Sequence, residues 1–318
     1  MRTLVAAVAL LFISCASWAD PLPSWADTET KSAIISFVER VTDPTSPDYV
    51  TPADRIATFD NDGNLWAEQP VYFQFIYALD RLKEKADEDA TILTSDTLKA
   101  AAAGDVATLA AGGVEALLEV LAISHSGMSV EAFQDDVLAW LETARHPTTG
   151  KRYDEMVYQP MLELLSYLRD QDFQTWIVSG GGVHFIRAFA EAAYNIPPEQ
   201  VMGSSGPTEY VDGKVMKLPG IDFIDDKEGK PVGIDSRIGK RPIFASGNSD
   251  GDFAMLEYTT AGDGARFGLL LHHTDAEREF AYDREGHIGV LNRGLDEGPD
   301  RGWVIVDMAN DWKQVWPD

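Results

Sequence analysis

Three short apolar segments of this chain each end abruptly in polar residues, and this feature constrains the fold more than any other. Residues 55–59, 173–178 and 242–246 are rich in β-branched and aromatic side chains and predict buried strands. In the second half of the chain, helical patterns separate the strands, which favours a parallel sheet with right-handed crossovers. Ligands of such sheets bind beyond the carboxyl ends of the strands. The polar residues that follow the three strands are therefore expected to lie together.

The remaining periodicities divide the chain into two regions. Helices are expected at 32–41, 160–170, 183–194, 230–239 and from 252 to 258, further strands at 200–202 and 267–271, and a hairpin turn at 211–214. Residues 71–145 carry only helical patterns, at 71–84, 95–103, 113–123 and 129–145. We therefore predict an all-helical cap domain at 69–157, inserted into a Rossmann-like α/β core domain at 20–68 and 158–318.

The first 19 residues have the pattern of a secretory signal peptide. A basic start at Arg2, an apolar run from Leu4 to Ile13 and small residues before Asp20 predict cleavage after Ala19 and a periplasmic or secreted protein. A membrane anchor is the alternative, but the run is far shorter than the roughly 20 residues of a spanning helix. The only cysteine, Cys15, lies within this segment, where a lipoprotein signal is a further alternative. The cleaved chain would contain neither disulfides nor thiolate metal sites.

The charge of the chain is strongly negative, −26 over 318 residues, and removing residues 1–19 takes away only Arg2 and leaves −27. Such a charge repels nucleic acid and anionic membrane surfaces, so neither is expected as a partner. A solvated acidic surface that keeps the protein soluble also accounts for this charge. An anionic substrate would then need a site that is locally positive.

The first polar strand end is Asp60-Asn61-Asp62-Gly63. Residues i and i+2 of an extended backbone point the same way, so the Asp60 and Asp62 carboxylates would face one point and repel each other. A cation between the two carboxylates, or a proton on one of them, relieves that repulsion. A polar turn with no further role is the alternative interpretation of this stretch.

Four polar motifs, in this order, resemble those of the haloacid dehalogenase superfamily of phosphatases. Asp60-Asn61-Asp62-Gly63 is similar to the first motif, DxDG, and Ser179 at a strand end to the second. Lys230 in Gly229-Lys230-Pro231 is similar to the third, and Gly247-Asn248-Ser249-Asp250-Gly251-Asp252 to the fourth, usually GDSxxD. The helical insertion resembles the cap of the phosphoserine-phosphatase-like branch, which inserts between the first two motifs.

The resemblance implies a role for each motif residue. Asp60 would attack phosphorus and form an aspartyl phosphate, and Asp62 would act as general acid and then as general base. Ser179, the Gly180 and Gly181 N–H groups and Lys230 would bind phosphate. Mg²⁺ would offset the repulsion between the phosphate and the carboxylates. Its implied ligands are Asp60, the Asp62 backbone carbonyl, Asn248 and Asp252.

The sequence departs from the family pattern at two positions. Asn248 stands where aspartate is usual, and it can offer Mg²⁺ a carbonyl oxygen but no charge, so either metal affinity is lower or Asp250 takes part. Asn64 stands where threonine is usual, which affects local phosphate contacts.

Several residues keep simpler alternatives. Ser179 can be a helix N-cap, and Asp250 and Asp252 can be an N-cap and a first-turn acid. Trp66 and Glu68 are interpreted either as substrate-lining residues or as hinge packing. The other open candidates are Lys227 and Lys240 as rivals of Lys230, His184 as a packing residue, and His272 and His273 as structural or cap-facing residues.

The sequence thus predicts an exported, Mg²⁺-dependent phosphomonoester hydrolase that acts on a small phosphorylated metabolite. A non-catalytic phospholigand-binding protein on the same fold is the first alternative, which Asn64 and Asn248 favour. A dehalogenase is the second, and Asp62 argues against it because a leaving halide needs no acid. The sequence identifies neither the substrate nor the oligomeric state.

Overall fold

A computed structural model describes residues 20–318, except for the side chains of residues 106, 107, 110, 111, 113–115 and 117. The predicted signal peptide, with Cys15, lies outside the described residues. None of the helices formed by the described residues is both long enough and apolar enough to span a membrane.

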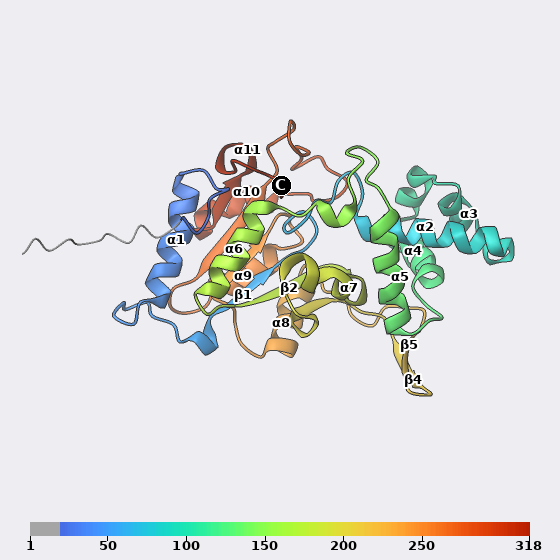
Figure 1. Cartoon of the computed structure of the whole chain (residues 1–318), viewed down its shortest axis with the longest axis horizontal. Helices are drawn as coiled ribbons and strands as arrows, with labels where there is room; N and C mark the ends of the chain where they lie inside the picture. Colours follow the sequence, from blue (N-terminus) through green and yellow to red (C-terminus); the bar gives the residue numbers. More distant parts are fainter. Residues whose placement is uncertain (1–19) are drawn as a thin grey trace, which may run out of the picture.

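The centre of the protein is a six-stranded sheet in the order β3-β2-β1-β6-β7-β8 (Figure 1). All neighbouring strands run parallel, which confirms the predicted fold class. The strands are β1 (Ile56–Phe59), β2 (Gln174–Gly182), β3 (Val201–Ser204), β6 (Phe244–Gly247), β7 (Phe267–His272) and β8 (Val304–Asp307). The central strand β1 lies between β2 and β6, so the polar ends of the three predicted strands meet at one edge of the sheet.

Two apolar clusters cover the two faces of the sheet. Alternate residues of a strand face opposite sides, and Leu269 and Leu271 of β7 join the larger cluster whereas Leu270 joins the smaller. The larger cluster includes side chains of α1 (Glu29–Thr42), α6 (Gln159–Asp170) and α7 (Val183–Tyr194). The smaller includes side chains of α8 (Gly229–Ile238) and α9 (Phe253–Thr260). The sheet is thus buried on both faces, as expected for parallel strands.

The second strand continues further than the sequence predicts. We expected the strand to end at Val178, but β2 runs to Gly182. Helix α7 begins at Val183, as predicted. Strand β3 pairs with Ser179 and again with Gly182, with a shift in register between the two. A Cβ on Gly203 of β3 would lie 2.7 Å from the Gly181 oxygen, so this close pairing requires glycine.

The helical insertion lies at one end of the molecule, beside the sheet rather than over it (Figure 1). It contains α2 (Phe73–Glu88), α3 (Asp96–Ala102), α4 (Val106–Ser124) and α5 (Val130–Thr143), and α4 begins seven residues earlier than predicted. Its apolar residues form a cluster of their own: Ala78, Leu82, Leu98, Ala101, Leu109, Ala116 and Val120. No strand interrupts 73–143 among the described residues, as expected. The domain boundaries at 69 and 157 stay a prediction.

A hairpin of β4 (Thr208–Val211) and β5 (Lys214–Lys217) projects below the insertion (Figure 1). Its turn residues Asp212 and Gly213 have φ values of 46° and 86°, as the predicted two-residue turn requires. The hairpin reaches the insertion through the backbone, because the Lys217 N–H donates to the Met128 oxygen and the Gly127 N–H donates to the Lys217 oxygen. The hairpin therefore links the core to the end of α4 and the start of α5.

Candidate active site

Asp60 leaves the central strand as the first residue of the polar loop. Its N–H donates to the Ser246 oxygen of β6 over 2.9 Å, which extends the sheet by one bond. The Asn64 amide donates to the Asp60 backbone oxygen over 3.0 Å and accepts from the Ser246 hydroxyl over 2.7 Å. Asn64, one of the two departures from the family pattern, is buried and holds this loop against β6. The Asp60 carboxylate is thereby set at the carboxyl edge of the sheet.

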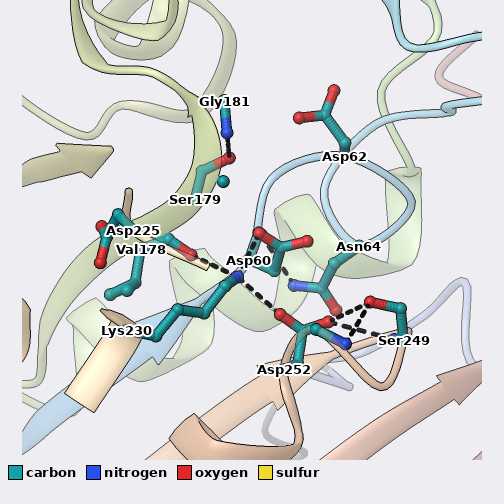
Figure 2. A network of polar contacts seen from close by, with 12 residues as sticks. Asp60, Asp62, Asn64, Val178, Ser179, Gly181, Asp225, Lys230, Ser249 and Asp252 are labelled. Atoms are coloured by element: carbon teal, nitrogen blue, oxygen red, sulfur yellow. Dashed lines mark hydrogen bonds and ion pairs between the residues drawn. The ribbon is translucent and has the colours of Figure 1, made fainter. Parts of the chain in front are cut away.

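The Lys230 ammonium lies between two carboxylates (Figure 2). Its Nζ is 2.6 Å from Asp60 Oδ1, 2.6 Å from Asp252 Oδ1 and 2.8 Å from the Val178 oxygen of β2. Lys230 is buried at the start of α8, whereas its two rivals are exposed and one of them, Lys240, pairs with Asp54. The structure therefore brings Lys230 to the predicted site.

The second carboxylate oxygen of Asp252 accepts hydrogen bonds from the fourth motif itself. The Asn248 and Ser249 N–H groups donate to Asp252 Oδ2 over 2.9 and 3.1 Å. The carboxylate thus holds Lys230 on one side and closes the turn after β6 on the other. Its predicted role as a metal ligand stays a prediction.

Asp62 lies apart from the lysine, on the side of the loop toward Ser179 (Figure 2). The Trp66 indole N–H donates to Asp62 Oδ1 over 2.8 Å and orients the carboxylate. A Cβ on Gly181 would lie 3.3 Å from Ser179 Oγ and 3.4 Å from Asp62 Oδ2, so these two groups flank Gly181. Ser179 Oγ also accepts the Gly181 N–H over 3.0 Å. Ser179, a predicted phosphate-binding residue of β2, and Gly181 therefore lie next to Asp62, whereas a Cβ on Gly180 would meet Asp226.

Burial determines the electrostatics of the site. Burial, followed by the charge of Asp252, raises the pKa of Asp60 well above its ordinary value, and Lys230 opposes the rise. Burial also raises the pKa of Asp62, while its bond from Trp66 opposes the rise. Burial lowers the pKa of Lys230, but Asp252 and Asp60 outweigh it and raise the pKa above its ordinary value. The Lys230 ammonium therefore opposes protonation of Asp60, and the raised pKa of Asp62 favours the protonated form of that carboxyl.

The donors for a divalent cation are oxygen atoms of mixed kinds. No group of three His, Cys, Asp or Glu side chains within residues 20–318 is arranged to hold a metal ion unaided. The Asn248 Oδ1 atom, however, is buried and has no hydrogen-bond partner in this part of the chain. Asp60, the Asp62 carbonyl and Asn248 offer the hard oxygen ligands that Mg²⁺ prefers, so the residues fit such an ion.

The alternative fourth-motif ligand, Asp250, is committed elsewhere. Its carboxylate accepts the N–H groups of Asn292, Arg293 and Gly294 over 2.9–3.1 Å. It therefore anchors the segment after β7 at the start of α10 (Arg293–Glu297). Asn248 is the better placed of the two residues to face a cation.

The histidines of interest support other groups. His273 is buried and its Nε2 donates to the Gly63 oxygen over 2.7 Å, so it holds the backbone of the first motif in place. His272 is half-buried with Nε2 3.3 Å from Asp283 Oδ2. The His184 Nδ1 atom lies 3.0 Å from Lys217 Nζ, and burial lowers the pKa of His184 to about 4. His273 and His184 thus have structural contacts, as one of their interpretations required.

Trp66 and Glu68 are buried, so the hinge-packing alternative describes them better than substrate lining. Trp66 stacks on Phe189 of α7 at a ring distance of 4.5 Å and meets Phe73 of α2 edge-on at 4.9 Å. Trp66 therefore joins the first motif to both the core and the insertion. Burial raises the pKa of Glu68 well above its ordinary value, although Tyr282 donates a hydrogen bond to it.

Sequence reasoning missed Gln74, which brings the insertion to the phosphate-binding residues. Gln74 Oε1 accepts the Gly182 N–H over 2.7 Å, and its Nε2 lies 3.1 Å from His125 Nε2. The Ser124 hydroxyl donates to the Val120 oxygen, so Ser124 Oγ accepts from His125 Nδ1 and His125 Nε2 accepts from Gln74. Burial lowers the pKa of His125 to about 3, which agrees with this neutral form. Nothing in the sequence near Gln74 indicated this contact.

Asp225 was also missed. It is fully buried beside Val178 (Figure 2), and neither carboxylate oxygen has a hydrogen-bond partner in the described residues. Burial raises its pKa to about 7, against the opposing charge of Lys230. In the sequence, the only indication of a role for Asp225 was its position five residues before Lys230.

Comparisons with known proteins agree with this geometry. The family model for haloacid dehalogenase-like hydrolases matches residues 57–257, which is more than half of the chain and spans all four motifs. The chain belongs to this family, and the predicted recognition is confirmed. No curated protein matches the chain.

Solved structures show a shared fold at low identity. A conserved protein of unknown function from Anaerococcus prevotii is 17% identical, with a TM-score of 0.54 over 80% of this chain and 88% of its own. A protein of unknown function from Bordetella pertussis is 16% identical, with a TM-score of 0.51 over 80% of this chain and 98% of its own. A phosphoserine phosphohydrolase-like protein from Francisella tularensis is 17% identical, with a TM-score of 0.41 over 77% of this chain and 98% of its own. The first two likenesses show the fold alone.

Proposed function

We propose that this protein is a phosphomonoester hydrolase that works through an aspartyl phosphate on Asp60. The observation that carries the proposal is the Lys230 ammonium 2.6 Å from Asp60 Oδ1, with Asp62 two residues further on. A fixed cation next to a carboxylate favours its ionised form and provides positive charge for an incoming phosphate. Membership of a hydrolase family supports the reaction class.

In the first step, a carboxylate oxygen of Asp60 attacks the phosphorus. The phosphorus–oxygen bond to the leaving group breaks, and the leaving oxygen takes a proton from Asp62. Burial raises the Asp62 pKa, which favours the protonated form that this step requires. The Trp66 indole bond orients Asp62 toward Ser179 and Gly181, where the phosphate would bind.

In the second step, a water molecule attacks the phosphorus of the aspartyl phosphate. The bond to the Asp60 oxygen breaks, and Asp62 accepts the proton of the water, which restores both groups. Lys230 remains beside Asp60 and stabilises the carboxylate that leaves. The chain thus supplies the nucleophile, the acid and base, and one fixed cation.

Mg²⁺ completes the proposal as the cofactor. Asp60, the Asp62 carbonyl and Asn248 would hold it, and when bound it would offset the negative charge of the phosphate and the carboxylates. The helical insertion would cover a small substrate and limit access of water in the first step. Its place between the Asp60 and Ser179 elements supports the phosphoserine-phosphatase-like branch. The pattern of residues 1–19 supports export to the periplasm or the medium.

Release of phosphate from an aryl phosphate ester in the presence of Mg²⁺ tests the function. We expect activity in the wild type, loss of at least about 10³-fold in Asp60→Asn, and loss on full chelation. Unchanged activity in Asp60→Asn would contradict the mechanism. Tight binding of a phosphate ester without turnover in the wild type would instead identify a phospholigand-binding protein.

A further inference from the structure

Glu68 is a buried carboxylate beside the proposed metal site with no role in the mechanism above. Glu68 lies at the end of the loop that carries Asp60 and Asp62, and only 2% of its surface is exposed. Its Oε1 atom accepts the Asn248 amide N–H over 2.9 Å and the Tyr282 hydroxyl over 2.8 Å. Both donors are neutral, and no ion pair joins Glu68 to a Lys, Arg or His within the described part of the chain. A buried carboxylate without a cation is costly.

The backbone around Glu68 packs closely on its carboxylate. A Cβ on Gly63 would lie 2.5 Å from Glu68 Oε1 and 2.1 Å from Asn248 Nδ2. A Cβ on Gly289 would lie 2.2 Å from the same carboxylate oxygen. Both glycines have positive φ, 73° and 63°, so the chain approaches the carboxylate closely from two directions.

The bond to Glu68 determines which way the Asn248 amide faces. A carboxylate oxygen that already accepts from Tyr282 accepts the amide N–H₂ and not its oxygen, which identifies Nδ2 as the atom toward Glu68. Asn248 Oδ1 is then turned away from Glu68, buried and without a partner. An unsatisfied buried acceptor costs about 1–3 kcal/mol. A hard cation would satisfy it.

The negative charge around the site also favours a bound cation. Asp60, Asp62, Glu68 and Asp252 gather within one buried region, and Lys230 is the cation that pairs with two of them. Asn248 itself brings no charge to this region. In their ionised forms these carboxylates carry more negative charge than Lys230 offsets, and a divalent cation would reduce that excess.

We propose that Glu68 is a positioning residue for the divalent cation: it holds Asn248 with its carbonyl oxygen toward the ion, and beside the bound ion its ionised carboxylate provides the negative charge that an amide at this position lacks. The proposal rests on the Mg²⁺ dependence proposed above. Glu68 and Asn248 act together as one acidic ligand, with the charge on one residue and the coordinating oxygen on the other.

Calorimetric titration with Mg²⁺ tests the proposal without reference to activity. We expect Glu68→Gln, which keeps the shape and removes the charge, to bind Mg²⁺ about 10- to 100-fold more weakly than the wild type. The double variant Glu68→Gln/Asn248→Asp moves the charge onto the coordinating residue and should recover affinity to within a few-fold. The matched control is Glu163→Gln, which removes a carboxylate that accepts from Ser24 and Gln159 and should leave the affinity unchanged.

The outcomes separate the two proposals. A wild type that binds no Mg²⁺ overturns the metal dependence of the proposed function, and this inference with it. A wild type that binds and a Glu68→Gln variant that binds equally well overturn this inference alone. If Glu68→Gln does not fold, the double variant decides, and an affinity below a tenth of the wild-type value contradicts the proposal.

Discussion

The catalytic edge of the sheet and the helical insertion are stabilised in different ways. At the sheet edge, the ammonium of Lys230 and the carboxylates of Asp60 and Asp252 have side-chain exposures of only 2%, 11% and 1%. In the insertion, the core is an apolar cluster, and ion pairs such as Lys99 with Asp96 lie at the surface. Buried charges are costly to separate, whereas surface pairs contribute little. Removing one charge should therefore matter greatly in the first region and barely in the second.

The largest effect is expected for Lys230→Met. It leaves Asp60 and Asp252 buried without their cation, which should cost about 3–5 kcal/mol of unfolding free energy and abolish phosphatase activity. Urea denaturation measures the stability. The control is Lys99→Met in the insertion, which should change it by no more than about 0.5 kcal/mol. Equal losses in the two variants would show that the two regions do not differ.

Asp225→Asn should have a smaller effect that depends on pH. Because the Asp225 pKa is about 7 in the folded protein, the folded state holds a proton that the unfolded state has lost between about pH 4 and pH 7. Stability therefore falls as pH rises through this window and levels off above it, by roughly 4 kcal/mol at most. The variant should lose this part of the pH dependence.

Denaturation curves between pH 4 and pH 8 measure the difference. Asp96→Asn, which removes a fully exposed carboxylate of the insertion, is the matched control and should keep the wild-type profile. A profile of Asp225→Asn that parallels the wild type would show that the buried carboxyl does not titrate in this range.

The smallest effect is expected where the two regions meet. Gln74→Leu removes the acceptor of the Gly182 N–H, so the strand that carries Ser179 loses a bond and kcat/KM should fall about 10-fold, with little change in stability. Gln134→Leu is the control, since its amide bonds the His184 oxygen at 3.4 Å and touches no predicted site residue. Steady-state kinetics with an aryl phosphate compare them. Equal kcat/KM values for Gln74→Leu and the wild type would mean that the insertion does not help to position the site.

The same two regions differ in how far the sequence predicted them. Asp60, Lys230 and Asp252 could be predicted because each follows a strand or starts a helix at the carboxyl edge of a parallel sheet, where function requires charge. Gln74 could not, because its role depends on a contact with Gly182, 108 residues away, and its neighbours in sequence are only aromatic. Such a contact exists only once tertiary packing has brought the insertion to the sheet.

The C-terminal part of the fold was hardest to predict. Strand β8 has four residues, Val304–Asp307, and it follows a long stretch in which only the short α10 gives a regular pattern. The predicted second strand ended at Val178, whereas β2 continues through residues 179–182 because Gly203 allows β3 to pair closely with them. In the glycine segment pairing with a neighbouring strand outweighed local sequence preference, whereas the β-branched residues of β8 favour a strand by themselves.

The segment between β7 and β8 reaches back to the nucleophile loop and to the fourth motif: His273 donates to the Gly63 oxygen, Tyr282 donates to Glu68, and the N–H groups of residues 292–294 donate to Asp250. The residues of the nucleophile loop are made early in synthesis, and these supports are made more than 200 residues later. A nascent chain that already contains Asp60 and Lys230 still lacks this support. The site is therefore completed late in synthesis. A chain that ends before Tyr282 should have no phosphatase activity, even if its first strands have formed.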